Sequence, residues 1–180
     1  MPQRSCYIFY LFADDTNLLY AHKSLKILEK IINEELVNIH DWLNSNKLSL
    51  NIKKTNFVIF HPYQKQLNYD INLKIYDNNT KNFTRLERKD YVKYLGVLID
   101  SNLTWKYHIS LVASKISKSV GIICKLRHFV PFSTLLNIYN SLISPYLTYG
   151  LVAWGQAAKS HIKKILILQI RVLRLMNFAS

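Results

Sequence analysis

Two adjacent aspartates near the N-terminus, enclosed by two short apolar runs, constrain the fold of this chain more than any other feature. The first run, residues 6–12, is rich in aromatic and β-prone side chains, and a second run, residues 18–20, follows after a few positions. Runs of this length and composition are typical of strands. The intervening Asp-Asp-Thr-Asn of residues 14–17 is typical of a turn. The sequence therefore predicts a β-hairpin with two negative charges at its tip.

The paired carboxylates of Asp14 and Asp15 indicate a candidate metal site. Like charges side by side repel, so a cation is expected to hold both groups ionised. Hard carboxylate oxygens suit Mg²⁺ or Mn²⁺, and Mg²⁺ binds through one or two carboxylates together with substrate phosphates. Asp and Asn are also ordinary turn residues. On these residues alone, a structural turn is therefore favoured over a metal site.

Five ordered blocks of residues resemble one protein family. Residues 12–15, Phe-Ala-Asp-Asp, resemble the Phe/Tyr-x-Asp-Asp motif of reverse transcriptases, and with Thr-Asn-Leu-Leu attached they are similar to the version in jockey-like non-LTR retrotransposons. Four further blocks follow in the order of that family, within residues 42–60, 94–109, 115–131 and 138–155. The resemblance covers nearly everything from Tyr10 to the end of the chain.

The resemblance implies an α+β fold in two parts. Residues 1–100 are expected to form a partial polymerase palm, an antiparallel sheet with a packed helix that carries the Asp-Asp hairpin. Residues 101–180 are expected to form an all-α, thumb-like bundle. In the family, fingers and a further strand with another catalytic Asp lie upstream, and nothing before Asp14 here is acidic. We therefore interpret the chain as a C-terminal palm and thumb fragment.

The resemblance also implies roles for individual residues at the catalytic end. Asp14 would be the principal metal ligand of the hairpin and Asp15 a supporting one, and both count as catalytic. Lys54, which precedes Thr55, would be the third catalytic residue and would protonate the departing pyrophosphate. A cation or proton donor there stabilises a leaving group that gains negative charge. Spacing alone favours ordinary loop lysines at Lys53 and Lys54, and only the motif distinguishes Lys54.

A second implied element is the primer grip, which holds the 3′ end of the primer toward the metals. The residues that resemble it are Tyr94, Leu95 and Gly96. Glycine permits close approach of another backbone. A β-bulge or a packing glycine accounts for Gly96 equally well.

Charge is distributed unevenly along the chain. The net charge is +13, and the segment after Asp100 carries ten Lys or Arg and no Asp or Glu. A segment with only positive charge attracts polyanions, most simply nucleic-acid phosphates. The predicted contacts to a nucleic-acid backbone are Lys115, Lys118, Lys125, Arg127, Lys163 and Lys164. A solvated basic face, or binding of the helix at residues 159–177 to an anionic membrane surface, are the alternatives.

Apolar spacing predicts the remaining elements. Helices are expected over residues 24–44, from residue 104, from Ser133 and over residues 159–177, with Pro145 ending or kinking the second of the three C-terminal ones. Strands are expected over residues 56–60 and 91–99. A surface hairpin of low functional content is expected from residues 71–76 and 82–86. The scattered histidines are expected to be structural or exposed.

The composition places the chain inside the cell. Only Cys6 and Cys124 are present, without metal spacing, which fits a reducing compartment. The N-terminus lacks the layout of a signal peptide, so a cytoplasmic or nuclear location is expected. Residues 129–154 are uncharged, but Pro131 and Pro145 make them a poor spanning helix. No stable membrane insertion is expected.

The function that the resemblance implies is RNA-directed DNA polymerisation. The expected partners are an RNA template, a DNA primer, deoxynucleoside triphosphates and the missing fingers and palm of the same polyprotein. The fragment by itself is expected to be inactive, because it lacks the upstream catalytic strand. The alternative is a non-catalytic remnant that binds nucleic acid through its basic helices.

Overall fold

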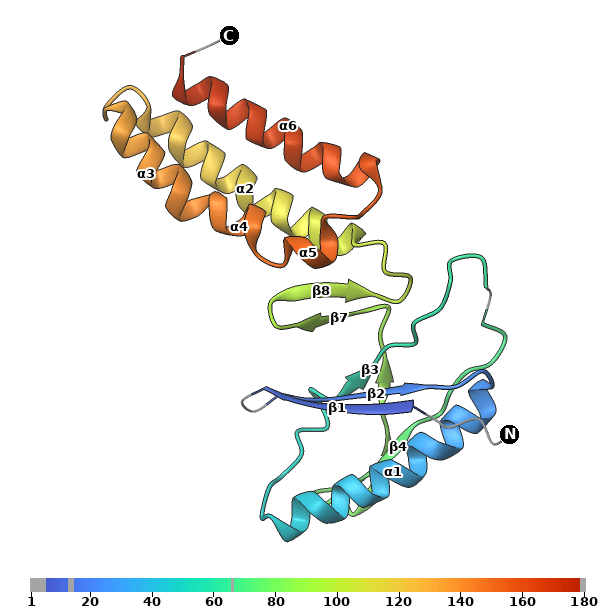
Figure 1. Cartoon of the computed structure of the whole chain (residues 1–180). Coiled ribbons are helices and arrows are strands. Elements are labelled where there is room, and N and C mark those ends of the chain that lie inside the picture. Colours follow the sequence, from blue (N-terminus) through green and yellow to red (C-terminus); the bar gives the residue numbers. More distant parts are fainter. Residues whose placement is uncertain (1–5, 13–14, 66, 179–180) are drawn as a thin grey trace. The chain divides into compact units, whose positions relative to one another are not determined.

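The chain forms two compact units, which are described separately. A computed structural model describes residues 6–12, 15–65 and 67–178 (Figure 1). Unit 1 consists of Met1–Phe57 and Tyr63–Lys89, and unit 2 consists of Val58–Pro62 and Asp90–Ser180. Both contain strands and helices, so the predicted α+β class is confirmed.

The hairpin at the start of unit 1 forms as predicted. Strands β1 (Cys6–Phe12) and β2 (Asp15–Ala21) are antiparallel, and their register ends at the pair Phe12 and Asp15. The second strand begins at Asp15, whereas the sequence predicted Leu18. Thr is a good strand former, and each ladder pair satisfies backbone groups that a longer turn would leave to solvent. Ala13 and Asp14 lie outside the described residues.

The predicted amphipathic helix is α1 (Leu25–Ser45), and it packs against the hairpin of β4 (Lys74–Asp77) and β5 (Asn82–Arg85). One side chain ties the helix to this hairpin. Asn33 of α1 donates to the carbonyl of Asn72 at 3.1 Å and accepts from the backbone N–H of Lys74 at 2.9 Å. The edge of β4 is therefore fixed by a helix rather than by another strand.

The hairpin of β4 and β5 has one buried side, formed by Ile75 and by the apolar residues that flank the two strands, whereas β5 itself is mostly exposed, as expected for a surface hairpin. Among the side chains that the structure describes, the buried apolar residues of this unit are Leu36 on α1 together with Ile71, Leu73, Ile75 and Leu86. The turn residues Asp77 to Thr80 made the segment look like surface. Its apolar residues nevertheless alternate toward α1, because successive strand side chains point to opposite faces.

The predicted strand over residues 56–60 is only two residues long. β3 (Asn56–Phe57) pairs in parallel with β6 (Glu87–Arg88), and the N–H of Lys89 continues this pairing to the carbonyl of Phe57 at 2.9 Å. The chain then enters unit 2, where the N–H of His61 donates to the carbonyl of Ser101 at 3.0 Å. His61 therefore bonds to the segment at residues 101–102, since its carbonyl also accepts from the side chain of Asn102 at 2.9 Å.

Unit 2 begins with a hairpin where the sequence predicted one continuous strand. β7 (Tyr91–Tyr94) pairs antiparallel with β8 (Val97–Asp100), and only Leu95 and Gly96 connect them. Both connecting residues have positive φ, 45° and 84°. Positive φ at both central positions is typical of the type I′ turn, whose twist matches that of the paired strands. The glycine allows the chain to reverse inside the apolar run.

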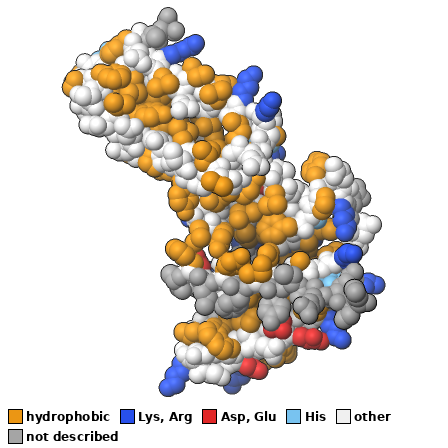
Figure 2. Space-filling view, in the orientation of Figure 1, with side chains coloured by type: hydrophobic (Ala, Val, Ile, Leu, Met, Phe, Trp, Pro, Cys, Tyr) orange, Lys and Arg blue, Asp and Glu red, His pale blue; other side chains and the backbone are white. Residues whose placement is uncertain are grey.

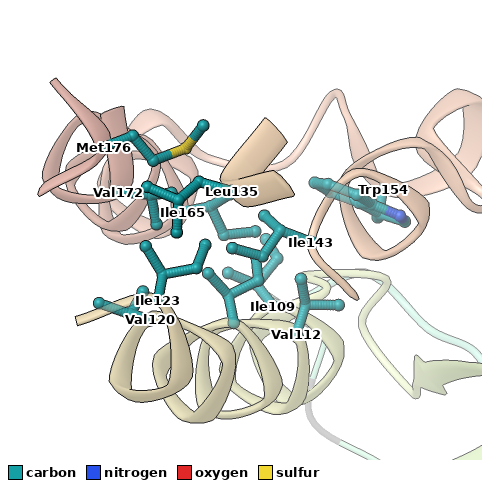
Figure 3. Packing of buried hydrophobic residues seen from close by; sticks show 11 residues of the cluster. Ile109, Val112, Val120, Ile123, Leu135, Ile143, Trp154, Ile165, Val172 and Met176 are labelled. Carbon is teal, nitrogen blue, oxygen red and sulfur yellow. The ribbon is translucent and has the colours of Figure 1, made fainter. Parts of the chain in front are cut away.

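The rest of unit 2 is helical. The helices are α2 (Lys106–Leu126), α3 (Phe132–Leu142), α4 (Ser144–Thr148), α5 (Leu151–Trp154) and α6 (Lys159–Met176). The long helices match the sequence-based expectation, and Pro145 and Gly150 divide the segment between them into short ones. Their apolar stripes form one core, in which side chains of α2 point toward those of α3 and α6 (Figure 3).

A buried carboxylate fixes the start of α2. Asp100 is 4% exposed. Its Oδ2 accepts from the backbone N–H and the hydroxyl of Thr104, both at 2.8 Å, and its Oδ1 accepts from the N–H of Trp105 at 2.7 Å. The first N–H groups of a helix lack partners within the helix and need such acceptors. A negative charge at this end also interacts favourably with the helix dipole. Asp100 therefore links the end of β8 to α2.

Candidate functional site

Asp15 is the described member of the predicted metal-binding pair. It is exposed, and it occupies the first position of β2 opposite Phe12. An exposed carboxylate at the end of a hairpin fits a hard cation such as Mg²⁺. Within the described part of the chain, no group of three or more His, Cys, Asp or Glu is arranged to hold a metal. Asp15 thus offers one ligand, and the prediction for Asp14 lies outside the described residues.

Lys54 belongs to unit 1, as Asp15 does, and is exposed. It lies in a tight turn. The N–H of Lys54 and the hydroxyl of Thr55 both donate to the carbonyl of Asn51 at 3.0 Å. Asn56 donates back to the carbonyl of Lys54 at 2.9 Å. These bonds hold the backbone of the turn and leave the ammonium group in solvent. The catalytic role of Lys54 stays a prediction.

The three residues that resemble a primer grip lie in unit 2, at the turn between β7 and β8. Tyr94 ends β7, and Leu95 and Gly96 form the turn itself. A Cβ added to Gly96 would lie 3.3 Å from Cε1 of Tyr149, and the hydroxyl of Tyr149 donates to the carbonyl of Leu95 at 2.5 Å. Gly96 therefore allows the tight turn and also the close approach of the Tyr149 ring. It is not part of a β-bulge, which was one alternative for this glycine.

The basic residues predicted to contact phosphates lie on the helices of unit 2. Lys115, Lys118 and Lys125 are exposed on α2, Lys163 and Lys164 are exposed on α6, and Arg127 is half-buried just after α2. The Nζ of Lys115 lies 4.9 Å from the centre of the Tyr146 ring. Figure 2 shows Lys and Arg side chains over the helices of this unit. The exposed amines carry charge without a carboxylate on the same helix.

His108 has a structural place in unit 2. It is 3% exposed, and its Nδ1 accepts from the N–H of Leu98 at 3.3 Å. Burial lowers the pKa of this imidazole, and the charge of Lys115 lowers it further. A neutral ring is therefore the form that the fold accommodates. Sequence reasoning placed His108 among structural or exposed histidines and did not identify its contact with β8.

Sequence reasoning also missed the role of Tyr149. The residue was part of a recognised block with Gly150, but no local pattern connected it to Leu95. The local sequence signals in this segment are the Tyr-Gly of residues 149–150 and the Trp-Gly of residues 154–155. None of the helices that the structure describes is long and apolar enough to cross a bilayer.

Comparison with known proteins gives a consistent set of relatives. The chain is 29% identical over 167 residues to the RNA-directed DNA polymerase from mobile element jockey of Drosophila melanogaster. The aligned region covers 91% of the chain and 17% of that protein. It is 27% identical over 169 residues to the probable RNA-directed DNA polymerase from transposon X-element of the same organism, and 26% identical over 170 residues to that from transposon BS.

The chain spans less than a fifth of the length of these curated relatives, 17% to 18%. No family model matches it, and no solved structure matches it either. The relatives nevertheless all bear the name that the residue blocks suggested. Over about nine-tenths of its length, the chain is thus similar to RNA-directed DNA polymerases of mobile elements, and the resemblance to non-LTR retrotransposon reverse transcriptases is confirmed.

Proposed function

We propose that the chain is the palm and thumb segment of a reverse transcriptase that extends a DNA primer on an RNA template. The observation that carries the proposal is similarity over 91% of the chain to proteins named RNA-directed DNA polymerases. The hairpin of β1 and β2, with an exposed Asp15 at its end, supports it. Deoxynucleoside triphosphates are the proposed substrates.

In this proposal the chain supplies carboxylates, a cation and a backbone turn. Asp14 and Asp15 would hold Mg²⁺ or Mn²⁺, and a metal pair, when bound, activates the attacking oxygen of the primer and stabilises the leaving oxygen. Lys54 would donate a proton to pyrophosphate, which its exposure permits. The turn at Leu95 and Gly96 would hold the end of the primer.

The direct test replaces the matching segment of the jockey polymerase with this chain and measures RNA-templated DNA synthesis. We expect the chimera to extend a primer, and Asp14→Asn or Asp15→Asn to reduce the rate at least about 100-fold, since metal ions supply several kcal/mol of charge stabilisation. Asp41→Asn is the matched control, because Asp41 is an exposed carboxylate on α1. Equal loss in the control, or no loss in the hairpin variants, would contradict the proposal.

The isolated chain is expected not to polymerise DNA. Two metals need a further carboxylate, and we propose that another part of a longer polymerase supplies it. Primer extension by the isolated chain provides the test. Synthesis that depends on Asp14 would show that the chain contains a complete site.

A second activity, favoured by the charge of unit 2, is duplex binding through phosphates without sequence preference. Each phosphate contact contributes about −0.9 to the slope of log K against log salt, so changing Lys118 and Lys125 to Gln should reduce the slope by about 2. Lys30→Gln in unit 1 serves as the control, because Lys30 is exposed and lies near Glu34. A binding affinity that does not change with salt concentration would argue against phosphate contacts. Flotation with anionic liposomes tests the membrane-surface alternative.

A further inference from the structure

The segment from Tyr149 to Trp154 has no role in the function proposed so far, yet it contacts the predicted primer grip directly. Tyr149 lies 54 residues after Leu95 in the sequence, and its hydroxyl donates to the carbonyl of Leu95 at 2.5 Å. Its ring also covers Gly96, with Cε1 at 3.3 Å from the place of a Cβ. One side chain therefore binds one residue of the turn and packs on the other.

Tyr149 is itself held in position by Gly150 and Trp154. Gly150 has φ 66°, and a Cβ there would lie 3.0 Å from Cγ2 of Val97 on β8. Trp154 is 2% exposed, and its indole N–H donates to the carbonyl of Tyr149 at 2.8 Å. The glycine thus allows the segment to approach the hairpin, and the buried indole fixes the backbone of the tyrosine.

A second attachment joins the same hairpin to α2. The N–H of Leu98 donates to Nδ1 of His108 at 3.3 Å, and the ring of His108 lies 5.8 Å from that of Trp154. The hairpin is therefore attached at its turn by Tyr149 and along β8 by His108. Both attachments meet at Trp154, which belongs to the core of the helices.

These attachments matter because a two-stranded hairpin is at best marginally stable in water. The turn also contains Leu95 at positive φ, a conformation that non-glycine residues adopt at a cost. The structure therefore needs contacts from outside the hairpin to hold the turn in one conformation. The helices of unit 2 provide them.

We propose that Tyr149 is a positioning residue, which fixes the Leu95–Gly96 turn through its hydroxyl and ring so that the turn can hold the end of the primer strand. The inference rests on the proposed function for its second half, since contact of the turn with a primer belongs to that proposal. Tyr149 acts through the turn and does not touch the primer. Gly150 and Trp154 support it in this place.

The first test measures amide hydrogen exchange at residues 95–98 in the full chain. Tyr149→Phe removes one hydrogen bond and keeps the ring, so exchange at these amides should become about fivefold faster. Tyr149→Ala also removes the ring and should have a larger effect. Tyr63→Phe makes the same change at a tyrosine that is 81% exposed and should change nothing. Unchanged exchange at the turn in Tyr149→Phe, with the α2 and α6 amides intact, would overturn the attachment.

The second test uses the jockey chimera and separates primer positioning from duplex binding. Tyr149→Phe should lower kcat for extension at least about tenfold, since small misplacements of reacting atoms are costly, and should leave the Kd for the primer–template duplex unchanged. Normal kcat despite faster exchange at the turn would overturn the positioning role. A chimera that makes no DNA with wild-type Tyr149 would instead refute the proposed function, while the exchange result would still decide the attachment.

Discussion

The two units differ in how their apolar residues are covered. In unit 2, eleven buried residues from the helices form one continuous cluster. In unit 1, the five buried residues whose side chains the structure describes lie on α1 and around the β4–β5 hairpin, and its described strands form two-stranded sheets. Helices satisfy their backbone groups internally, whereas strands need neighbours. The helices of unit 2 therefore bring their apolar side chains into one shared cluster, whereas the strands of unit 1 depend on neighbouring segments to cover theirs.

The β1–β2 hairpin shows this difference most clearly. Ile8, Tyr10 and Phe12 alternate along β1 and share one face, and Leu19 lies opposite Ile8 on β2. All four are between 38% and 57% exposed. Exposed apolar residues of this size on a hairpin that carries the proposed metal ligands fit a surface that another part of a longer protein covers. We expect unit 1 to be the less stable of the two.

The largest effect should come from core deletions that compare the units. Ile116→Ala removes a residue with 0% exposure from the centre of α2 and should lower the free energy of unfolding of unit 2 by about 3–4 kcal/mol. Leu36→Ala, at 7% exposure in unit 1, should cost about 2 kcal/mol, because the site is closer to solvent. Hydrogen exchange in increasing urea measures both. Equal costs would contradict the difference in packing.

The second comparison concerns the starts of the two long helices. Asp100→Ala removes three charge-assisted hydrogen bonds at α2 and should destabilise unit 2 by about 2–3 kcal/mol. Ser24→Ala at the start of α1 should change stability by less than about 0.5 kcal/mol, since Ser24 makes no side-chain capping bond. Urea unfolding followed by circular dichroism tests the pair. A comparable loss in Ser24→Ala would mean that both helices depend on their caps.

A third comparison uses one substitution at two glycines of unit 2. Gly96→Ala places a Cβ at φ 84° and against the ring of Tyr149, so it should cost about 1–2 kcal/mol. Gly121→Ala lies within α2, where nothing is within 4 Å of the new Cβ, and should stabilise by about 0.5–1 kcal/mol. Thermal unfolding of the two variants measures the opposite signs. Two changes of the same sign would refute the assignment of the Gly96 turn.

The smallest expected effect is a pH dependence that belongs to unit 2. The folded pKa of His108 lies below its ordinary value, chiefly because of burial. As pH falls through about 6.5, His108 takes up a proton in the unfolded state but stays neutral in the folded state, so the stability of the fold should decrease. His108→Gln should remove this part of the dependence between pH 7.5 and 5. Urea midpoints at several pH values test it, and an unchanged slope in the variant would exclude His108 as the source.

Local patterns were sufficient for the elements whose partners lie nearby. The apolar spacing of Ile109, Ile116 and Ile123 predicted one buried stripe on α2, because residues seven apart share a helix face. The two apolar runs around the aspartates likewise predicted the β1–β2 pairing. Of the candidate site, the sequence provided the family resemblance and named Asp15 as a candidate ligand, while the exposure of Asp15 comes from the structure. The catalytic, metal-binding, primer-grip and phosphate-contact roles stay predictions, because they concern bound molecules.

The sequence by itself determined the periodic elements, the excess of positive charge after Asp100 and the similarity to mobile-element polymerases. Only the tertiary structure decided that residues 91–100 fold back at Gly96, that the segment around Ile75 is interior, and that Tyr149 binds Leu95. The reason is physical: periodicity reports which face of an element is apolar. Which distant residue covers that face depends on contacts between segments that no local pattern encodes.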